Sequence, residues 1–225
     1  MSTIQSAIAI RTSRLDLREL EFGDAEFILE LLNEAGFIRF IGDKGVRTLS
    51  DARDYIQHGP MESYARNGFG LYAARLRDGT PIGICGLVKR EGLNDPDVGF
   101  AFLSRYWSCG YAVESAAAVL AHARDTLRIK RVVAITSPDN WSSIAVLEKI
   151  GLKFERMIRL IDHSPELKLF GSAHAAAVTG AAVFVAGLAI RWYAIIYLGR
   201  FFTVNVAIAR DHELIEAGPS CGVYM

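Results

Sequence analysis

Residues 140–152 read NWSSIAVLEKIGL, a stretch with clear start and stop signals for a helix. Asn140 is a favoured N-cap residue, and Gly151 can end a helix in the left-handed conformation that glycine adopts most easily. Asn140 and Ser143 are three residues apart, so they lie on one face of the helix near its start. The pattern therefore predicts a helix over 140–150 that presents an amide and a hydroxyl on one side of its first turn.

A strand and a longer helix precede this segment. Residues 131–136 carry branched apolar side chains, which are typical of a buried strand. Apolar residues recur at helical spacing over 112–127, with Glu114 in the first turn and Arg124 near the end, as the helix dipole favours. The succession of helix, strand and helix indicates an α/β fold.

Further strands and two more helices are expected in the same part of the chain. Alternation of apolar and polar residues predicts strands, and Asp78-Gly79 predicts a hairpin turn. The residues expected in strands are 14–18, 69–76, 82–88, 98–103, 131–136, 152–161 and 166–170. Asp24 can cap one helix, and Thr48 with Asp51 resembles a capping box that opens another, which Gly59-Pro60 ends or bends. The chain therefore predicts a mixed sheet of six to seven strands with about four helices.

The bulk composition excludes several kinds of protein. The formal net charge is zero, so no overall field would attract nucleic acid. The three cysteines are far apart and show no C-x-x-C spacing, and none of the five histidines pairs at metal-ligand spacing. We therefore expect no metal site and no disulfide framework. His122 is expected to be a surface or packing residue.

Residues 105–112, RYWSCGYA, join the strand at 98–103 to the helix at 112–127. Small residues at 108, 110 and 112 let the backbone turn tightly and approach a ligand closely. The free N–H groups and the dipole of the helix start then favour an anion such as a diphosphate. Taken alone, the same pattern also fits an ordinary strand-to-helix loop.

Residues 107–112 resemble the acetyl-CoA loop of the GNAT superfamily of N-acetyltransferases, which commonly reads Gln/Arg-x-x-Gly-x-Gly/Ala. Gly110 and Ala112 match its last two fixed positions, whereas Trp107 stands where Gln or Arg is usual. The closer resemblance is to the branch that acetylates the N-termini of ribosomal proteins, whose loop often reads Tyr-Trp-Gly-x-Gly-Tyr-Ala. Ser108 replaces a glycine of that form, and it fits if its φ stays negative.

Other stretches resemble the same branch in the expected order. Its members show Asn-x-x-Ser-Ile-x-Val-Leu-Glu-Lys-x-Gly-Phe, which is close to residues 140–152. Residues 11–18, 82–87 and 97–100 resemble its first, third and fourth strands. The resemblance spans residues 8–171, about three quarters of the chain. It implies a GNAT-like α/β fold with a mixed, mostly antiparallel sheet.

The resemblance also implies acetyl-CoA as cosubstrate. In the family the pantetheine arm lies between two strands that splay apart and bonds to the backbone of the fourth strand, while the helix that follows meets the arm and the sulfur. The cofactor-binding residues that it implies are Phe100, Ala101, Phe102, Trp107, Ser108, Cys109, Gly110, Tyr111, Ala112, Asn140 and Ser143. Read without the resemblance, Asn140 is a plain N-cap and Ser143 is a solvated helix residue.

Acetyl transfer needs a proton donor for the leaving sulfur and an acceptor for the proton of the amine. Many family members use a tyrosine as the donor, at the position that Leu147 holds here. Because leucine has no proton to give, Ser143 is the candidate donor, directly or through water. Asp97 is the first candidate base, followed by Glu91 and Asp95, and ordered water is the alternative to a single base. A nucleophilic Cys109 is disfavoured by its place in the phosphate loop.

The amino-acid composition changes near Gly171, and residues 175–190 contain no charged side chain. The tail from about 174 to 219 resembles a fragment of the membrane-bound isoprenylcysteine carboxyl methyltransferase family, chiefly at residues 188–204 and 211–219. Residues 220–225 replace the segment that would help to bind S-adenosylmethionine. With Arg191 and the residues after it, the apolar segment 175–199 is long enough to cross a bilayer. The alternatives are a helix packed on the domain, a homodimer contact, and a fusion or frameshift remnant.

We therefore expect a GNAT acetyltransferase domain over 1–171 and an apolar helical appendage over 172–225. The predicted function is acetyl transfer from acetyl-CoA to a primary amine, either a protein N-terminus or a small molecule, in a cytoplasmic enzyme that does not bind nucleic acid. The competing hypotheses are a non-catalytic acyl-CoA binding module and a membrane-anchored protein whose tail derives from a methyltransferase.

Overall fold

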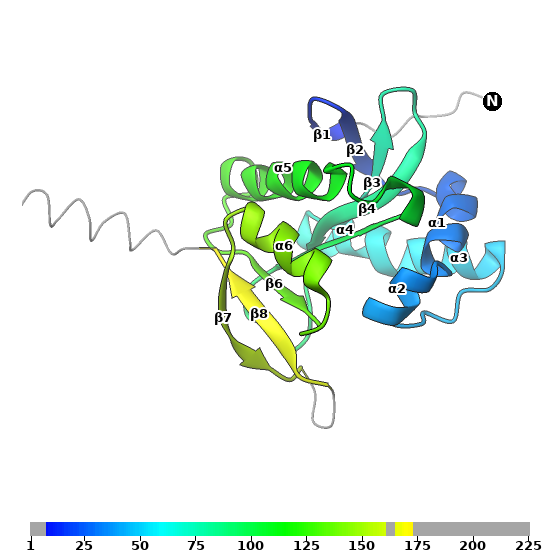
Figure 1. Ribbon diagram of the computed structural model, residues 1–225. Coiled ribbons are helices and arrows are strands. Elements are labelled where there is room, and N and C mark those ends of the chain that lie inside the picture. The colour runs from blue at the N-terminus through cyan, green and yellow to red at the C-terminus, as the bar shows by residue number, and fades with distance from the viewer. Residues whose placement is uncertain (1–7, 161–164, 173–225) are drawn as a thin grey trace, which may run out of the picture. The chain divides into compact units, whose positions relative to one another are not determined.

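The computed structural model describes residues 8–160 and 165–172 (Figure 1). They form one eight-stranded sheet in the order β1-β2-β3-β4-β5-β6-β8-β7. The strands are β1 (Ile8–Arg11), β2 (Leu15–Glu19), β3 (Leu71–Leu76), β4 (Pro81–Val88), β5 (Asp97–Phe102), β6 (Val133–Thr136), β7 (Lys153–Ile158) and β8 (Leu167–Gly171). All neighbouring pairs are antiparallel except β5 and β6, which confirms the mixed, mostly antiparallel sheet.

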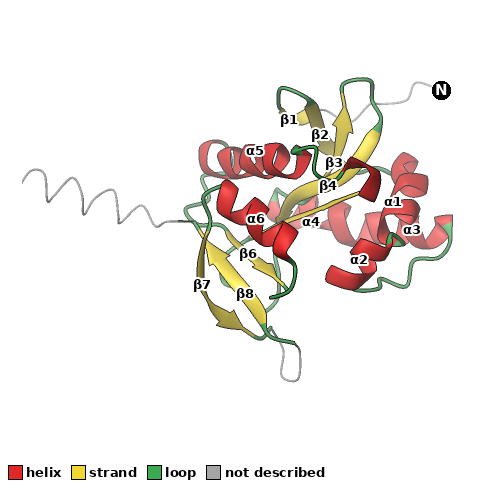
Figure 2. Ribbon diagram, viewed as in Figure 1, coloured by secondary structure: helices red, strands yellow, loops and turns green. Residues whose placement is uncertain are grey.

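Six α-helices accompany the strands within the described residues (Figure 2). They are α1 (Ala25–Leu32), α2 (Ala35–Phe40), α3 (Leu49–Ile56), α4 (Glu62–Asn67), α5 (Tyr111–Asp125) and α6 (Trp141–Lys149). The Thr48–Asp51 capping box opens α3, and the Asn140 side chain caps α6 by accepting from the Ser143 N–H, both as predicted. Gly151 follows α6 with a positive φ of 87°.

The sheet has one strand more than the six or seven that the sequence predicts, and the helices exceed the predicted four. The extra strand is β1, a mostly exposed four-residue edge strand that lacks apolar alternation. The unexpected helix α2 spans only six residues and contains a glycine, so its periodicity is too short to detect. Gly59-Pro60 does not end its helix, because the chain continues through a π-helical turn at Gln57–Met61 into α4.

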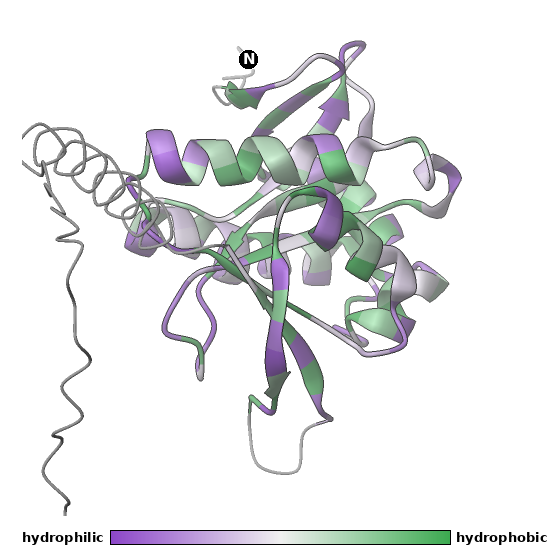
Figure 3. Ribbon diagram, turned by 60° about the vertical axis from the view of Figure 1, so that its left-hand side comes forward, coloured by the Kyte–Doolittle hydropathy of each residue, from purple (hydrophilic) through white to green (hydrophobic). Residues whose placement is uncertain are grey.

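Two hydrophobic cores lie on the two faces of the sheet. On one face α5 and α6 pack through Ala116, Val119 and Leu147 against the central strands. On the other face α1 and α3 pack through buried residues that include Ile28 and Ile56. Figure 3 colours the hydrophobic residues of the strands and helices green, and they concentrate along the inner strands between these layers. Burial on both faces fixes the register of the sheet.

The parallel pair β5 and β6 is joined only at its beginning. Its single register pair is Asp97 with Val133, whereas β4 pairs with β5 along all six residues of β5. The side of β5 that faces β6 is therefore unpaired after its first residue. This divergence agrees with the splayed strands that the sequence resemblance implies.

Residues 173–225 lie outside the described part of the chain, so the predictions for the appendage stay predictions. Across residues 8–160 and 165–172, every helix is too short or too polar to cross a bilayer. The segment 175–199 lies outside these residues.

Candidate active site

One cavity of about 810 Å³ opens where β5 and β6 diverge. Its walls come from β5, the turn before α5, the start of α6, and a third group formed by α2, the π-helical turn and α4. Most of the residues that the sequence assigns to cofactor binding line it, namely Phe100, Ala101, Phe102, Trp107, Ser108, Gly110, Tyr111, Ala112, Asn140 and Ser143. Cys109 is the exception: it is exposed, and it is not among the residues that form the wall.

The turn between β5 and α5 contains two left-handed residues. Gly110 has a φ of 82°, and Ser108 has a φ of 59°. The expectation that Ser108 keeps a negative φ is therefore wrong. The left-handed region costs an L-residue about 1–2 kcal/mol, which is a physical reason for the glycine that the resembling family has at this position.

We predict that Ser108→Gly stabilises the protein by about 1 kcal/mol, because glycine adopts a φ of 59° without the penalty that serine pays. The measurement is the free energy of unfolding in urea. Ser104→Gly is the matched control, since Ser104 begins a 3-10 turn with negative φ and glycine there only adds chain entropy to the unfolded state. Equal destabilisation of both variants would contradict the strain at Ser108.

The first turn of α5 presents its backbone amides to the cavity. Gly110 is the N-cap residue, and no side chain caps the helix there. The intrahelical ladder begins with the Glu114 N–H, which donates to the Gly110 carbonyl at 3.1 Å. Tyr111, Ala112 and Val113 line the cavity ahead of it. Free N–H groups at the positive end of a fifteen-residue helix form a suitable cradle for a diphosphate.

A network from the β1–β2 turn holds α5 from the other side. Glu114 accepts from the Thr12 hydroxyl at 2.6 Å, from the Ser13 hydroxyl at 2.9 Å and from the Arg14 N–H at 2.8 Å. The Arg14 guanidinium donates to the second Glu114 oxygen at 2.6 Å. Burial by itself would raise the pKa of Glu114, but these donors, with the Thr12 hydroxyl first, lower it to about 2. Glu114 is therefore ionised at neutral pH.

The start of α6 forms the opposite wall. Asn140 is buried, and its side-chain oxygen accepts from the Ser143 N–H at 3.1 Å and from the Ser142 hydroxyl at 3.0 Å. Asn140 thus acts as an N-cap, which is the simpler of the two readings of this residue. Ser143 is half-buried and lines the cavity.

Asp97 is the first residue of β5 and lies where β5 still pairs with β6, before the two strands diverge. Its side chain is only 2% exposed. One oxygen accepts from the Arg90 guanidinium at 2.5 Å, and the other accepts from the Ile135 N–H at 3.1 Å. Burial raises the pKa of Asp97 to about 6, even though both donors favour the ionised form. Of the three candidate bases only Asp97 lines the cavity, since Glu91 is exposed and Asp95 pairs with Arg131 at 2.7 Å.

The third wall of the cavity comes from residues that the sequence analysis did not single out. Phe37 on α2, Tyr55 on α3, His58 in the π-helical turn and Glu62 on α4 all line it. The available signal was the Gly59-Pro60 pair inside a helical pattern, because π-turns within helices often lie at functional sites. Trp107 also reaches this wall: its indole N–H donates to the Phe102 carbonyl at 2.7 Å, and its ring packs against Gly36.

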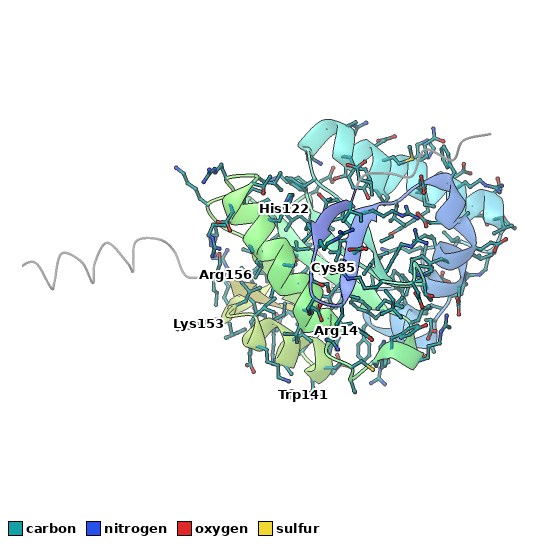
Figure 4. The ribbon with its side chains drawn as sticks, turned by 90° about the horizontal axis from the view of Figure 1, so that it is seen from above. Arg14, Cys85, His122, Trp141, Lys153 and Arg156 are labelled. Atoms are coloured by element: carbon teal, nitrogen blue, oxygen red, sulfur yellow. The ribbon has the colours of Figure 1, made fainter. Side chains whose placement is uncertain are left out.

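Groups of His, Cys, Asp and Glu side chains close enough to hold a metal ion are absent from residues 8–160 and 165–172. His122 is half-buried on α5, and burial lowers its pKa. In Figure 4 His122 lies at the far end of α5 from Arg14. His122 is not among the residues that line the cavity.

Comparisons with known proteins agree with this geometry. The sequence model of the family described as acetyltransferase (GNAT) domain matches residues 14–153. The chain is 29% identical over 147 residues to an uncharacterized N-acetyltransferase, YnaD, of Bacillus subtilis, covering 65% of this chain and 83% of that protein. The match to the GNAT family includes the turn before α5 and the start of α6, but it does not extend to residues after 153.

Solved structures show the same fold. An acetyltransferase of the GNAT family from Bacillus anthracis superposes with a TM-score of 0.61 at 26% identity, covering 72% of this chain and 96% of that one. RimL, a ribosomal L7/L12 alpha-N-protein acetyltransferase solved in complex with coenzyme A, has a TM-score of 0.65 at 17% identity, covering 73% and 97%. At that identity the likeness to RimL concerns the fold alone.

Proposed function

Because this chain belongs to the GNAT family of acetyltransferases, we propose that it transfers acetyl from acetyl-CoA to a primary amine by direct attack in a ternary complex. The observation that carries the proposal is that one cavity joins three features: the amide-lined turn before α5, the unpaired side of β5, and Asp97. A thioester cofactor and an amine can therefore meet in one chamber, and no covalent acetyl-enzyme is required.

In this proposal the diphosphate of acetyl-CoA binds at residues 108–113, and its pantetheine arm extends along the unpaired side of β5 at Phe100, Ala101 and Phe102. The arm takes the place of a neighbouring strand, because its amide groups can bond to the free backbone of β5. The thioester then lies near the start of α6. The structural neighbour RimL was solved in complex with coenzyme A, which supports acetyl-CoA as the cosubstrate.

The amine nitrogen attacks the thioester carbonyl carbon, and the carbon–sulfur bond breaks as the tetrahedral intermediate collapses. Ser143 gives a proton to the departing sulfur, directly or through water, because a thiol with a pKa of roughly 8.5 leaves more easily when protonated. Asp97 accepts the amine proton through water, because its side chain is only 2% exposed and an amine cannot reach it directly. The proton taken up by Asp97 returns through water to the Ser143 oxygen, so the enzyme is restored and the products are the acetylated amine and free coenzyme A.

The acceptor belongs in the part of the cavity formed by α2, the π-helical turn and α4. This part mixes aromatic residues such as Phe37 and Tyr55 with charged residues such as Lys44 and Glu62. Both a protein N-terminus and a small amine remain candidates. RimL acts on a ribosomal protein, whereas another neighbour, MccE, is a microcin C7 self immunity acetyltransferase, so the fold serves different acceptors.

The main competing function is a non-catalytic acyl-CoA binding module, and turnover separates the two. We expect the full chain to release coenzyme A from acetyl-CoA when primary amines, including peptides with free N-termini, are supplied. Ser143→Ala should lower kcat about tenfold and leave acetyl-CoA affinity unchanged, because water can replace the hydroxyl in part. Ser142→Ala is the matched control, since its hydroxyl bonds to Asn140. Tight binding without turnover on any amine would favour the binding module.

Several predictions from the sequence remain proposals. These are the boundary at 171/172, cytoplasmic location, a homodimer, membrane contact through 175–199, and the likeness of 188–219 to the isoprenylcysteine methyltransferases. The match to the GNAT family ends at residue 153, so it does not test these predictions. A methyltransferase-like protein predicts binding of S-adenosylmethionine by the full chain and solubility only in detergent, whereas the acetyltransferase proposal requires neither.

A further inference from the structure

We propose that Arg14 is a positioning residue that fixes the Cys109–Gly110 peptide so that the Gly110 N–H faces the diphosphate site. The inference rests on the proposed binding of acetyl-CoA at the turn before α5. Arg14 comes from the turn between β1 and β2, and Figure 4 shows it beside the first turn of α5. It lies 95 residues before the carbonyl that it contacts.

The contact that carries the inference is a hydrogen bond from Arg14 Nη1 to the Cys109 carbonyl oxygen at 3.0 Å. In a trans peptide the carbonyl and the next N–H point in opposite directions. A Cys109 carbonyl held toward Arg14 therefore directs the Gly110 N–H away from Arg14. Gly110 lines the cavity, whereas Arg14 and Cys109 are not among the residues of its wall, so the amide is turned to the cavity side.

The backbone of the turn does not fix this orientation by itself. Gly110 has a φ of 82°, and glycine adopts positive and negative φ almost equally well, so rotation of the peptide before it meets little steric resistance. The neighbouring Ser108, at a φ of 59°, is already in an unfavourable region. An external contact is therefore needed to keep one of the two orientations of the peptide.

Arg14 is itself held in place at three points. Its Nε donates to Glu114 at 2.6 Å, its backbone N–H donates to the same carboxylate at 2.8 Å, and its guanidinium lies 4.5 Å from the centre of the Tyr111 ring. Glu114 also accepts from Thr12 and Ser13, so the carboxylate is fixed by the whole β1–β2 turn. The planar guanidinium reaches Glu114 and the Cys109 carbonyl through two separate nitrogens, whereas lysine offers a single nitrogen on a flexible stem and does not reproduce that fixed two-point contact.

The test compares acetyl-CoA with acetyl-pantetheine, which has the thioester but lacks the diphosphate. We expect Arg14→Gln to raise the Kd for acetyl-CoA about tenfold and to leave the Kd for acetyl-pantetheine unchanged. A general structural defect would weaken both ligands. Arg14→Lys should bind acetyl-CoA as poorly as Arg14→Gln, because it restores the charge without the two-point contact. Arg11→Gln is the matched control, since Arg11 pairs with Asp16 on the same hairpin and should bind like the wild type.

Glu114→Gln separates orientation from simple charge, and it serves as the second variant if Arg14→Gln fails to fold. Loss of a negative charge near the diphosphate would by itself tighten acetyl-CoA binding. If Glu114 acts by holding Arg14, the variant instead weakens binding about threefold. Wild-type affinity in Arg14→Gln, rescue by Arg14→Lys, or tighter binding in Glu114→Gln would each overturn the inference. Failure of the wild type to bind acetyl-CoA would overturn the proposed function first.

Discussion

Gly110→Val is expected to weaken acetyl-CoA binding about 100-fold. Valine in the left-handed region costs about 1–2 kcal/mol or more, so the turn relaxes to another conformation and the amide cradle loses its shape. Losing one hydrogen bond to a charged phosphate adds about 1.5–3 kcal/mol, and each 1.4 kcal/mol is a factor of ten in the dissociation constant. The measurement is the Kd for acetyl-CoA by calorimetry.

Gly151→Val is the matched control for this prediction. Gly151 has nearly the same φ, 87°, an added Cβ there meets no atom within 4 Å, and it lies outside the cavity wall. It should therefore lose a comparable amount of stability and keep its affinity for acetyl-CoA. Wild-type affinity in a folded Gly110→Val protein would contradict the diphosphate assignment at residues 108–113. Gly110→Ala provides a milder variant should the valine protein not fold.

Asp97→Asn is expected to lower kcat/KM by about 10²–10⁴ at pH 7.5, the usual contribution of a positioned base. Burial raises the pKa of Asp97 to about 6, so the carboxylate is mostly ionised at neutral pH and loses its charge as the pH falls through 6. The wild-type profile of kcat/KM should therefore fall about tenfold per unit below pH 6. This acidic limb should be absent from the Asp97→Asn profile.

Two carboxylate variants serve as controls for Asp97. Asp95→Asn and Glu91→Gln should keep both the rate and the acidic limb, since Asp95 is engaged with Arg131 and Glu91 is exposed. An unchanged profile in Asp97→Asn would instead favour ordered water as the proton acceptor. A profile changed by Asp95→Asn or Glu91→Gln, but not by Asp97→Asn, would move the base to another loop position.

The raised pKa of Asp97 also predicts the direction of a stability change. Its folded value of about 6 exceeds the reference value of 3.8, so the folded state binds the proton more tightly than the unfolded state. The resulting stabilisation is fully present below about pH 4 and is lost as the pH rises through 6, by about 3 kcal/mol in total. The free energy of unfolding of the wild type, relative to Asp97→Asn, should therefore increase as the pH falls through this window.

Several local features of the fold could be predicted from sequence because their signals span only a few residues. The Thr48–Asp51 capping box and the Asn140 N-cap each depend on residues three apart, and both are found in the structure. The strand–turn–helix pattern at 98–127 likewise predicts a tight turn at residues 108–112, and in the structure Gly110 turns there with a positive φ. The elements missed, β1 and α2, are too short or too exposed to give a periodic pattern.

The conformation of Ser108 shows where local reasoning fails. By its own preference a serine adopts a negative φ. The chain, however, must leave the end of β5 and enter α5 within a few residues. Packing of both elements against the same core fixes those two ends. The residue between them accepts the strained conformation because the buried apolar area of the helix stabilises the fold by more than the strain costs.

The sequence by itself indicated the family through the resemblance of its motifs. It also predicted the tight turn at 108–112 and the helix that carries Asn140 and Ser143, since caps, glycines and periodicity act over a few residues. Only the tertiary structure decided which distant residues meet there. It brought Arg14 to the Cys109 carbonyl, and it brought the π-helical turn to the cavity that β5 and the start of α6 also line. These contacts depend on strand order and on the divergence of β5 from β6, which follow from the packing of both faces of the sheet rather than from any short stretch of chain.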